Sequence, residues 1–271
     1  MVKLVLTDMD GTLLHSDGYG VHPDLFATIT ELGRHGVRFA VASGRPAWNL
    51  RNLFAPILDE VTLICHNGAL VLDSGTETIC GELDPVLCEA LLLEVAADDG
   101  IYAVVDAEQG SYIDQKGTEF LSWKDSGPYV HVVDDLMEVC RDRRILLVKM
   151  FGRNWSYPGS LVDIAARFSG RCRAARSGDT SIDFTDLNVS KGAAVATLQR
   201  RLGVTADETM VFGDNDNDLE MFAEARYAYA VANASEHVRA AAAAVIGSND
   251  SDAVYHVLRD LLGGRPIPGG M

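Results

Sequence analysis

Short apolar runs alternate with amphipathic segments over the first 70 residues of the chain. Residues 2–7 (VKLVLT) form a β-rich run, and residues 24–35 place apolar side chains at helical spacing between a proline and a glycine. These flanking residues are typical start and stop signals of a helix. A second strand ending in Ser-Gly-Arg, a helix after Pro46 and a third strand over VTLICHNGA follow. This order predicts repeated strand–helix units.

The same alternation returns after the middle of the chain. A helix is expected to begin at Ser190 and to end at Gly203, and strand–helix pairs continue to the Gly- and Pro-rich tail. The alanine run at 240–244 is assigned to a helix. Strands that alternate with helices of this length favour a parallel sheet covered on both faces.

Residues 82–185 have a different pattern. They begin with an apolar helix and continue with short strands around IYAVVD, GSYID and TEFLSW. After a polar stretch come a strand, a helix and two further strands. We therefore expect residues 1–81 and 186–271 to form an α/β core, and residues 82–185 to form an inserted α+β unit.

Composition narrows the possible functions. The formal net charge of −16 at pH 7 and a pI near 4.7 argue against nucleic-acid binding through the bulk surface, which needs a basic face. No apolar stretch approaches the roughly 20 residues that span a bilayer, and the N-terminus reads as a strand rather than a targeting segment. The five scattered cysteines form no CxxC pair, so neither disulfides nor a zinc site are indicated. We expect a cytoplasmic protein without nucleic-acid or membrane partners.

Polar clusters follow the predicted core strands. In a parallel sheet the carboxyl ends of the strands share one edge, where ligands bind. Each cluster alone could be a turn, a helix cap or a solvated acidic loop, but their joint occurrence at strand ends favours a chemical role. The clusters are Asp8 with Asp10, Ser43-Gly44-Arg45, His66-Asn67-Gly68 and the run from Asp214 to Asp218. Lys191, at the start of the helix that follows the insert, can point to the same edge.

The residue types at this edge indicate a ligand. Three or more carboxylates in a partly buried crevice would take up protons unless a cation compensates them. Oxygen ligands of this kind suit Mg²⁺ better than a transition metal. The hydroxyl, amide, ammonium and backbone N–H donors around the carboxylates are those that bind phosphate.

The motifs DMDGTLL, VASGR, HNGA, SKG and GDNDNDLEM, in this order, resemble those of the haloacid dehalogenase (HAD) superfamily, and closely the Cof-type phosphatases with a C2B cap. The resemblance covers the whole core, whereas the insert matches in position and size alone. It implies a Rossmann-like parallel-sheet core, the HAD fold, with residues 82–185 as an α+β cap that selects the substrate.

The resemblance also implies roles for individual residues. Asp8 is expected to be the nucleophile that forms an aspartyl-phosphate, and Asp10 the general acid and then the base. Asp8, the backbone carbonyl of Asp10, and Asp214 are expected to hold Mg²⁺. Asp218 is expected to orient Lys191 or the loop. The residues expected to bind the phosphoryl group are Ser43, Gly44, Lys191 and Asn217.

Contacts to the leaving group are less defined by the resemblance. Arg45, His66 and Asn67 are core candidates, and Lys149, Arg153 and Trp155 are candidates in the insert. At the end of the insert, Asp183 and Asp186 stand where relatives often have a Glu-Ile-x-Pro segment, which bears on specificity rather than on the reaction.

The expected function is Mg²⁺-dependent hydrolysis of a small phosphorylated metabolite, such as a sugar phosphate. A phosphotransferase or phosphomutase stays open, because it would use the same aspartyl-phosphate and the same second aspartate. A non-catalytic phospho-accepting signalling module is less favoured, because such a module needs neither Asp10 nor a large insert.

Overall fold

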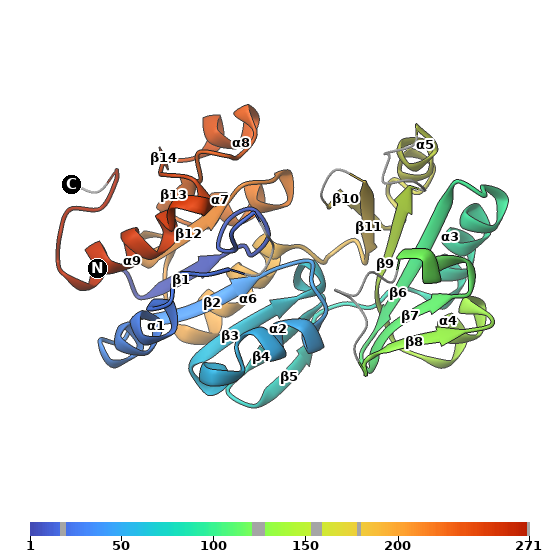
Figure 1. The fold of residues 1–271 in the computed structure, drawn as a ribbon, viewed down its shortest axis with the longest axis horizontal. Coiled ribbons are helices and arrows are strands. Elements are labelled where there is room, and N and C mark those ends of the chain that lie inside the picture. The colour runs from blue at the N-terminus through green and yellow to red at the C-terminus, as the bar shows by residue number, and fades with distance from the viewer. Residues whose placement is uncertain (17–19, 121–127, 153–158, 178–179, 270–271) are drawn as a thin grey trace.

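The computed structural model describes residues 1–16, 20–120, 128–152, 159–177 and 180–269. These residues form two β-sheets that lie next to each other along the long axis of the molecule (Figure 1). None of the helices in these ranges has the length and apolar character that crossing a bilayer requires.

The first sheet has eight strands. Six neighbouring strands pair in parallel, which confirms the predicted α/β architecture with a parallel-sheet core. The central strand β1 is buried along its whole length, as expected for a strand covered on both faces. In spatial order the strands are β14 (Ala244–Val245), β13 (Tyr227–Ala230), β12 (Thr209–Gly213), β1 (Leu4–Thr7), β2 (Arg38–Ala42), β3 (Val61–Cys65), β4 (Leu70–Asp73) and β5 (Thr76–Ile79).

The last two strands of this sheet, β4 and β5, form an antiparallel hairpin that the sequence interpretation missed. Its signal is the dipeptide Ser74-Gly75, in which both residues have positive φ angles of 50° and 77°. Two such residues are what a tight two-residue hairpin turn requires.

Helices cover both faces of the first sheet (Figure 1). α1 (Leu25–Arg34) packs against α9 (Ala253–Leu262), and α6 (Lys191–Leu202) packs against α7 (Leu219–Ala223). The buried positions of α1 recur at the spacing of one helix face. The remaining helices of this part are α2 (Ala47–Leu53) and α8 (Glu236–Ala241).

The assignment of the alanine run 240–244 to a helix is wrong beyond Ala241, where α8 ends. Ala244 instead pairs with Tyr229 in the edge strand β14. Pairing with the neighbouring strand outweighs the high helix propensity of alanine at this position.

The second sheet has six strands from the middle of the chain. Its neighbours pair antiparallel, except β7 and β8, which are parallel. Helices α3 (Pro85–Ala97), α4 (Leu136–Asp142) and α5 (Gly159–Arg167) pack on it. In spatial order the strands are β10 (Arg173–Arg176), β11 (Ser181–Thr185), β9 (Ile145–Gly152), β6 (Ile101–Ala107), β7 (Gly110–Asp114) and β8 (Val130–Val133).

One predicted strand in this region is wrong. The segment TEFLSW begins inside a 3₁₀ helix, Lys116–Phe120, and its last three residues lie outside the described ranges. The stretch that the sequence interpretation treated as polar contains β8 and α4. Asp135 begins α4 by accepting a hydrogen bond from the Met137 N–H at 2.8 Å, the usual role of an N-cap aspartate.

Buried apolar side chains form two clusters, one around each sheet. Leu83 pairs with Ile145 of β9 and belongs to the second cluster, whereas Val189 belongs to the first. The chain therefore passes from one core to the other shortly before α3 and returns shortly before α6.

Candidate active site

Lys191 joins two carboxylates at the centre of the site. Its side chain is 1% exposed, and Nζ donates hydrogen bonds to Asp8 Oδ1 at 2.7 Å and to Asp218 Oδ1 at 2.8 Å. Burial alone would lower the pKa of Lys191, but the charges of Asp218 and Asp8 outweigh burial and raise it. The ammonium group is therefore charged.

The chain places these groups through the ends of two strands and the start of a helix. Asp8 follows β1, and its N–H donates to the Phe212 carbonyl of β12 at 3.0 Å. Ser190 is the N-cap of α6 and accepts a hydrogen bond from the Ala193 N–H at 3.0 Å. The cap makes Lys191 the first residue of the helix, where it faces the ends of β1 and β12.

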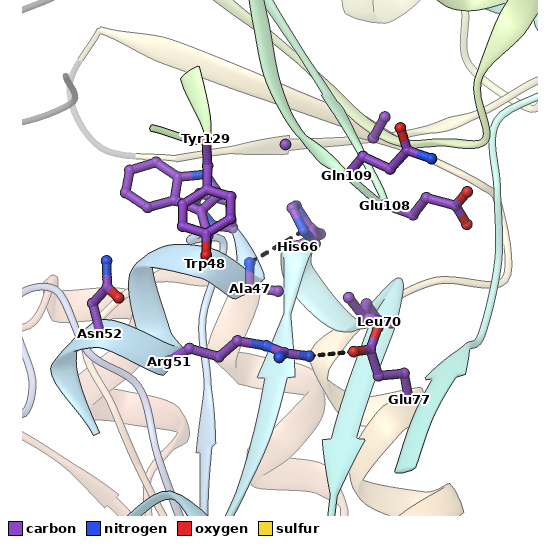
Figure 2. A pocket seen from close by; sticks show the side chains of 13 residues that line it. Ala47, Trp48, Arg51, Asn52, His66, Leu70, Glu77, Glu108, Gln109 and Tyr129 are labelled. Atoms are coloured by element: carbon purple, nitrogen blue, oxygen red, sulfur yellow. Dashed lines mark hydrogen bonds and ion pairs between the residues drawn. The ribbon is translucent and has the colours of Figure 1, made fainter. Parts of the chain in front are cut away.

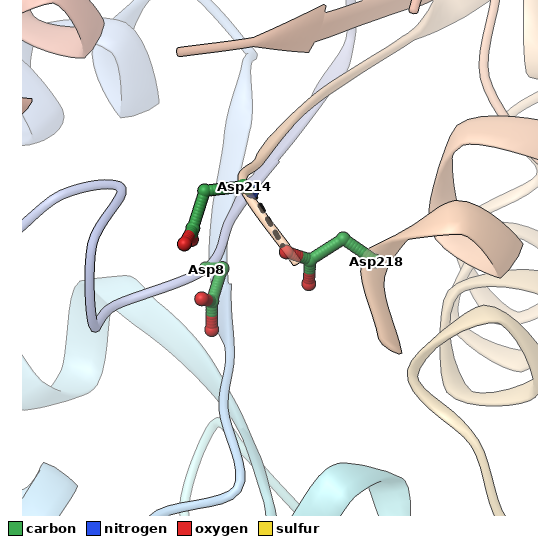
Figure 3. A group of neighbouring side chains, drawn as sticks. All are labelled: Asp8, Asp214 and Asp218. Atoms are coloured by element: carbon green, nitrogen blue, oxygen red, sulfur yellow. Dashed lines mark hydrogen bonds between the residues drawn. The ribbon is translucent and has the colours of Figure 1, made fainter. Parts of the chain in front are cut away.

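Asp8, Asp214 and Asp218 form an acidic cluster (Figure 3). One carboxylate oxygen of each lies within 4.8 Å of the others. Burial raises the pKa of Asp8 well above its ordinary value, and burial together with Asp218 raises the pKa of Asp214 to about 6. Carboxylates whose pKa values are raised by burial and mutual repulsion are stabilised by a nearby cation.

Asp218 differs from the other two members of the cluster. Besides Lys191, it accepts hydrogen bonds at Oδ2 from the N–H groups of Asp214 at 2.9 Å and Asn215 at 3.0 Å. Its carboxylate is therefore occupied by protein donors, and it orders both Lys191 and the loop. Asp8 and Asp214 have more capacity for an added ligand.

The turn after β1 is shaped to fit Asp214. Thr12 Oγ1 donates a hydrogen bond to Asp214 Oδ1 at 2.6 Å. Gly11 has a φ of +80°, and a Cβ atom there would lie 2.6 Å from Asp214 Oδ2. Only glycine combines this backbone angle with such a close approach. The role of Thr12 was missed by the sequence interpretation, although the residue lies in the quoted motif.

Asp10 does not join the acidic cluster but pairs with Arg45. The guanidinium donates from Nε to Oδ2 at 2.8 Å and from Nη2 to Oδ1 at 2.5 Å. Partial desolvation raises the pKa of the largely exposed Asp10 carboxylate, but the Arg45 guanidinium, with the charges of Lys149 and Lys191, outweighs it and brings the pKa below its ordinary value. The two aspartates of the first motif thus have opposite pKa shifts. Arg45, which is predicted to contact the leaving group, thus pairs with a predicted catalytic residue.

The predicted phosphate-binding residues lie beside this centre. Ser43 is buried, and its Oγ accepts a hydrogen bond from the Arg45 N–H at 3.1 Å. Asn217 Nδ2 donates to Asn67 Oδ1 at 3.2 Å, and the buried Asn217 Oδ1 has no partner among the described residues. These two asparagines therefore form a polar wall next to the Ser43-Gly44 turn.

A residue of the second sheet enters this wall. Asp183 of β11 accepts a hydrogen bond from Asn67 Nδ2 at 2.7 Å. A Cβ atom on Gly44 would lie 3.1 Å from Asp183 Oδ2, so glycine allows the carboxylate to approach the turn. The sequence interpretation noted Asp183 but gave it no contact. Polar and apolar residues alternate regularly in this strand (SIDFT), so the pattern places Asp183 on a polar face and gives no signal that the side chain is buried.

His66, a predicted leaving-group contact, is buried. Its Nε2 accepts a hydrogen bond from the Ala47 N–H at 3.4 Å, and its Nδ1 lies 3.5 Å from Asp106 Oδ2 of β6. The ring lines a cavity of about 330 Å³ together with Trp48 and Tyr129, whose ring centroids lie 6.1 Å apart (Figure 2). His66 thus contacts the second sheet.

Of the candidates in the insert, Lys149 lies next to Asp183, with 3.4 Å between Nζ and Oδ1. Arg153 and Trp155 lie outside the described residues.

The chain is similar to proteins of a known family. The chain matches the family model of haloacid dehalogenase-like hydrolases over residues 5–258. It is 26% identical over 269 residues to the 5-amino-6-(5-phospho-D-ribitylamino)uracil phosphatase YbjI of Escherichia coli strain K12, with 96% of each chain covered. It is 24% identical to the phosphatase YwpJ of Bacillus subtilis strain 168, with 96% of this chain and all of the relative covered.

A solved structure agrees with these relatives. SMU.1108c from Streptococcus mutans UA159 superposes with a TM-score of 0.85 at 27% identity, over 97% of this chain and 100% of that one. The chain belongs to the haloacid dehalogenase-like hydrolase family, as its motifs predicted. It is a phosphatase of that family, since the curated relatives that it matches over nearly their whole length are phosphatases.

Proposed function

We propose that the protein hydrolyses a small phosphorylated metabolite in the presence of Mg²⁺, through an aspartyl-phosphate formed on Asp8. The observation that carries this proposal is the contact of the buried Lys191 ammonium with Asp8 inside an acidic cluster. A lysine at this place opposes the effect of burial on the attacking carboxylate by favouring its ionised form, and it would neutralise charge on the phosphoryl oxygens.

The oxygen-only donor set of Asp8 and Asp214 fits a hard divalent cation, because burial and repulsion raise both pKa values. Asp8, the Asp10 carbonyl and Asp214 would hold Mg²⁺, which supplies positive charge at the phosphoryl group. Asp218 would act through Lys191 and the loop. Ser43, Lys191 and the Gly44 turn would bind the phosphoryl oxygens, with Asn217 beside them.

Asp10 is proposed as the general acid and base. In the described arrangement Arg45 holds the Asp10 carboxylate in its ionised form. Asp10 would give its proton to the leaving oxygen in the first step, and Arg45 would then stabilise the resulting carboxylate. That carboxylate would take a proton from the attacking water in the second step, which restores the acid for the next turnover.

We further propose that residues 82–185 act as a cap. Supporting this role, Asp183 and Asp106 of the second sheet contact Asn67 and His66 at the strand ends of the first sheet. A cap in this position would exclude water and contact the leaving group. The name of the Escherichia coli relative suggests a phosphorylated alcohol that carries several hydroxyl groups.

The experiment that tests the function replaces the nucleophile. Asp8→Asn should abolish Mg²⁺-dependent release of p-nitrophenol from p-nitrophenyl phosphate, because an amide cannot form the acyl-phosphate. The variant should stay folded, because burial already disfavours a charge at position 8 and the neutral amide of asparagine has the same shape as the carboxyl group. EDTA should remove wild-type activity, and added Mg²⁺ should restore it.

The matched control is Asp59→Asn, an exposed aspartate, which should keep wild-type rates. Undiminished turnover by Asp8→Asn would refute the assignment of the nucleophile. Incubation with a sugar phosphate, followed by scoring of free phosphate against transferred or isomerised phosphate, separates hydrolysis from phosphoryl transfer.

A further inference from the structure

The second sheet packs helices on one face, and its other face carries charged side chains that are buried. Alternate residues such as Val105, Val148 and Phe184 belong to the apolar cluster on which the helices pack. The opposite face also holds buried polar residues: Asp106 is 4% exposed and Asp183 is 1% exposed. Packing alone does not explain a polar sheet face that is shielded from water, because unpaired buried polar groups are costly.

Lys149 occupies the middle of this polar face. It lies directly opposite Asp183 in the antiparallel pairing of β9 with β11, so the two side chains share one face. Asp106 pairs with Leu147, two residues before Lys149 on the same strand, so its side chain shares that face as well. The face therefore presents one ammonium between two carboxylates.

Asp183 is buried and has several partners. Its side chain is 0% exposed, and it accepts hydrogen bonds from Asn67 Nδ2 and from Ser177 Oγ at 2.6 Å. With the Lys149 contact, three of the roughly four acceptor sites of a carboxylate are used. A side chain so enclosed positions its neighbours rather than touching a ligand.

Lys149 has free donor capacity. Its side chain is 22% exposed, and among the described residues its only polar contact is the long one to Asp183. An ammonium group has three N–H donors, so two are available for a ligand. Its partner Asp183 binds Asn67 and approaches the Gly44 turn, so Lys149 lies next to the predicted phosphate-binding residues.

The surrounding charges restrict what Lys149 can bind. Lys149 and Arg45 face the carboxylates Asp10, Asp106 and Asp183, so negative charge is in excess outside the phosphate site. An additional anionic group on the substrate would be repelled. A neutral oxygen, such as a hydroxyl of a polyol or sugar, can accept a hydrogen bond from Lys149 without that cost.

We propose that Lys149 is the specificity-determining residue of this phosphatase: it donates hydrogen bonds to hydroxyl oxygens of a neutral leaving alcohol, and Asp183 positions it. The inference rests on the proposed function, because it assigns a partner to the leaving group of that reaction. It predicts a preference for polyol or sugar monophosphates over phosphate esters whose alcohol carries a carboxylate.

The test compares three substrates. Sorbitol 6-phosphate has a hydroxyl-rich leaving alcohol, p-nitrophenyl phosphate has none of these hydroxyls, and 3-phosphoglycerate carries a carboxylate. The wild-type enzyme should have a higher kcat/KM for sorbitol 6-phosphate than for 3-phosphoglycerate. Lys149→Met, which keeps the length of the side chain without its donors, should lower the ratio of kcat/KM for sorbitol 6-phosphate over p-nitrophenyl phosphate by about tenfold, mainly through KM.

Three further variants complete the design. Lys149→Arg should retain most of the selectivity ratio, and Asp183→Asn should lower it by loosening Lys149. Lys116→Met removes an exposed ammonium from the same region and should keep the ratio of the wild type. If Lys149→Met does not fold, Lys149→Gln, which keeps a donor for Asp183, should still lower the ratio.

The outcomes separate the two proposals. A wild-type enzyme without Asp8-dependent turnover of p-nitrophenyl phosphate contradicts the proposed function itself. With that turnover present, a selectivity ratio unchanged in Lys149→Met, or a wild-type preference for 3-phosphoglycerate, overturns the role of Lys149 alone.

Discussion

At the scale of single residues, two carboxylates one residue apart have opposite environments. Asp8 is buried with Lys191 and has a raised pKa, whereas Asp10 is 57% exposed, is held by Arg45 and has a lowered pKa. The motif predicts that both lie at the strand end, and they do. It does not predict their partners, because Lys191 is 183 positions away from Asp8 in the sequence.

Gly11 offers a test at this scale. Gly11→Ala should destabilise the fold by about 1–2 kcal/mol, because alanine disfavours a φ of +80°. It should also lower kcat/KM about 100-fold, because the new Cβ would displace Asp214. Chemical denaturation and p-nitrophenyl phosphate kinetics measure the two effects.

Gly36→Ala is the matched control, since Gly36 has a φ of +76° with nothing within 4 Å of the added atom. It should lose similar stability but keep its activity. Equal activity losses in the two variants would show that the contact with Asp214 is unimportant.

At the scale of elements, periodicity predicted the central strands and most helices. The predicted helix over 24–35 corresponds to α1 (Leu25–Arg34), because its apolar spacing and its flanking residues agree. The hairpin of β4 and β5, and the short elements β8 and α4, were missed. Elements of four to seven residues give too few repeats for a period to stand out.

The start of α6 provides a prediction at this scale. Ser190→Ala should cost about 1 kcal/mol of stability, because Ser190 caps the helix. Since the cap fixes the first turn that carries Lys191, the variant should also lower kcat with p-nitrophenyl phosphate.

Ser235→Ala removes the corresponding cap of α8, where Ser235 accepts a hydrogen bond from the Val238 N–H. It should cost similar stability without a loss of kcat. If both variants keep full activity, the position of Lys191 does not depend on the cap.

At the scale of the whole molecule, polar contacts join the two sheets on several sides. Asn67 and His66 contact Asp183 and Asp106, and Arg173 of β10 pairs with Glu220 of α7. The sequence could not predict these contacts, because they join residues that are 40 to 116 positions apart and no periodic pattern links them. The motifs predicted the part of the site at the strand ends of the first sheet. The contact of Asp183 from the second sheet with Asn67 was found only in the structure.

Asp106 lies where the two sheets contact each other, and its charge makes the stability of the fold depend on pH. Burial raises its pKa, but the neighbouring His66 ring, the hydrogen bond from Ser111 and the charge of Lys149 outweigh burial and lower it. A carboxylate with a lower pKa in the folded than in the unfolded chain stabilises the fold above its unfolded value of about 3.9. This contribution is lost as the pH falls through the folded value.

Asp106→Asn should therefore lower the free energy of unfolding at pH 7 by about 1–3 kcal/mol, the cost of a weakened buried hydrogen-bond network. Its difference from the wild type should begin to shrink below about pH 4, where the unfolded wild-type chain takes up a proton, and should be lost once the pH falls below the lower pKa of the folded carboxylate. Urea denaturation at a series of pH values measures this difference. Asp99→Asn, at a position whose side chain is 89% exposed, should show little difference at any pH. If the difference in unfolding free energy between Asp106→Asn and the wild type stays constant down to pH 3, the charge of Asp106 does not stabilise the contact between the two sheets.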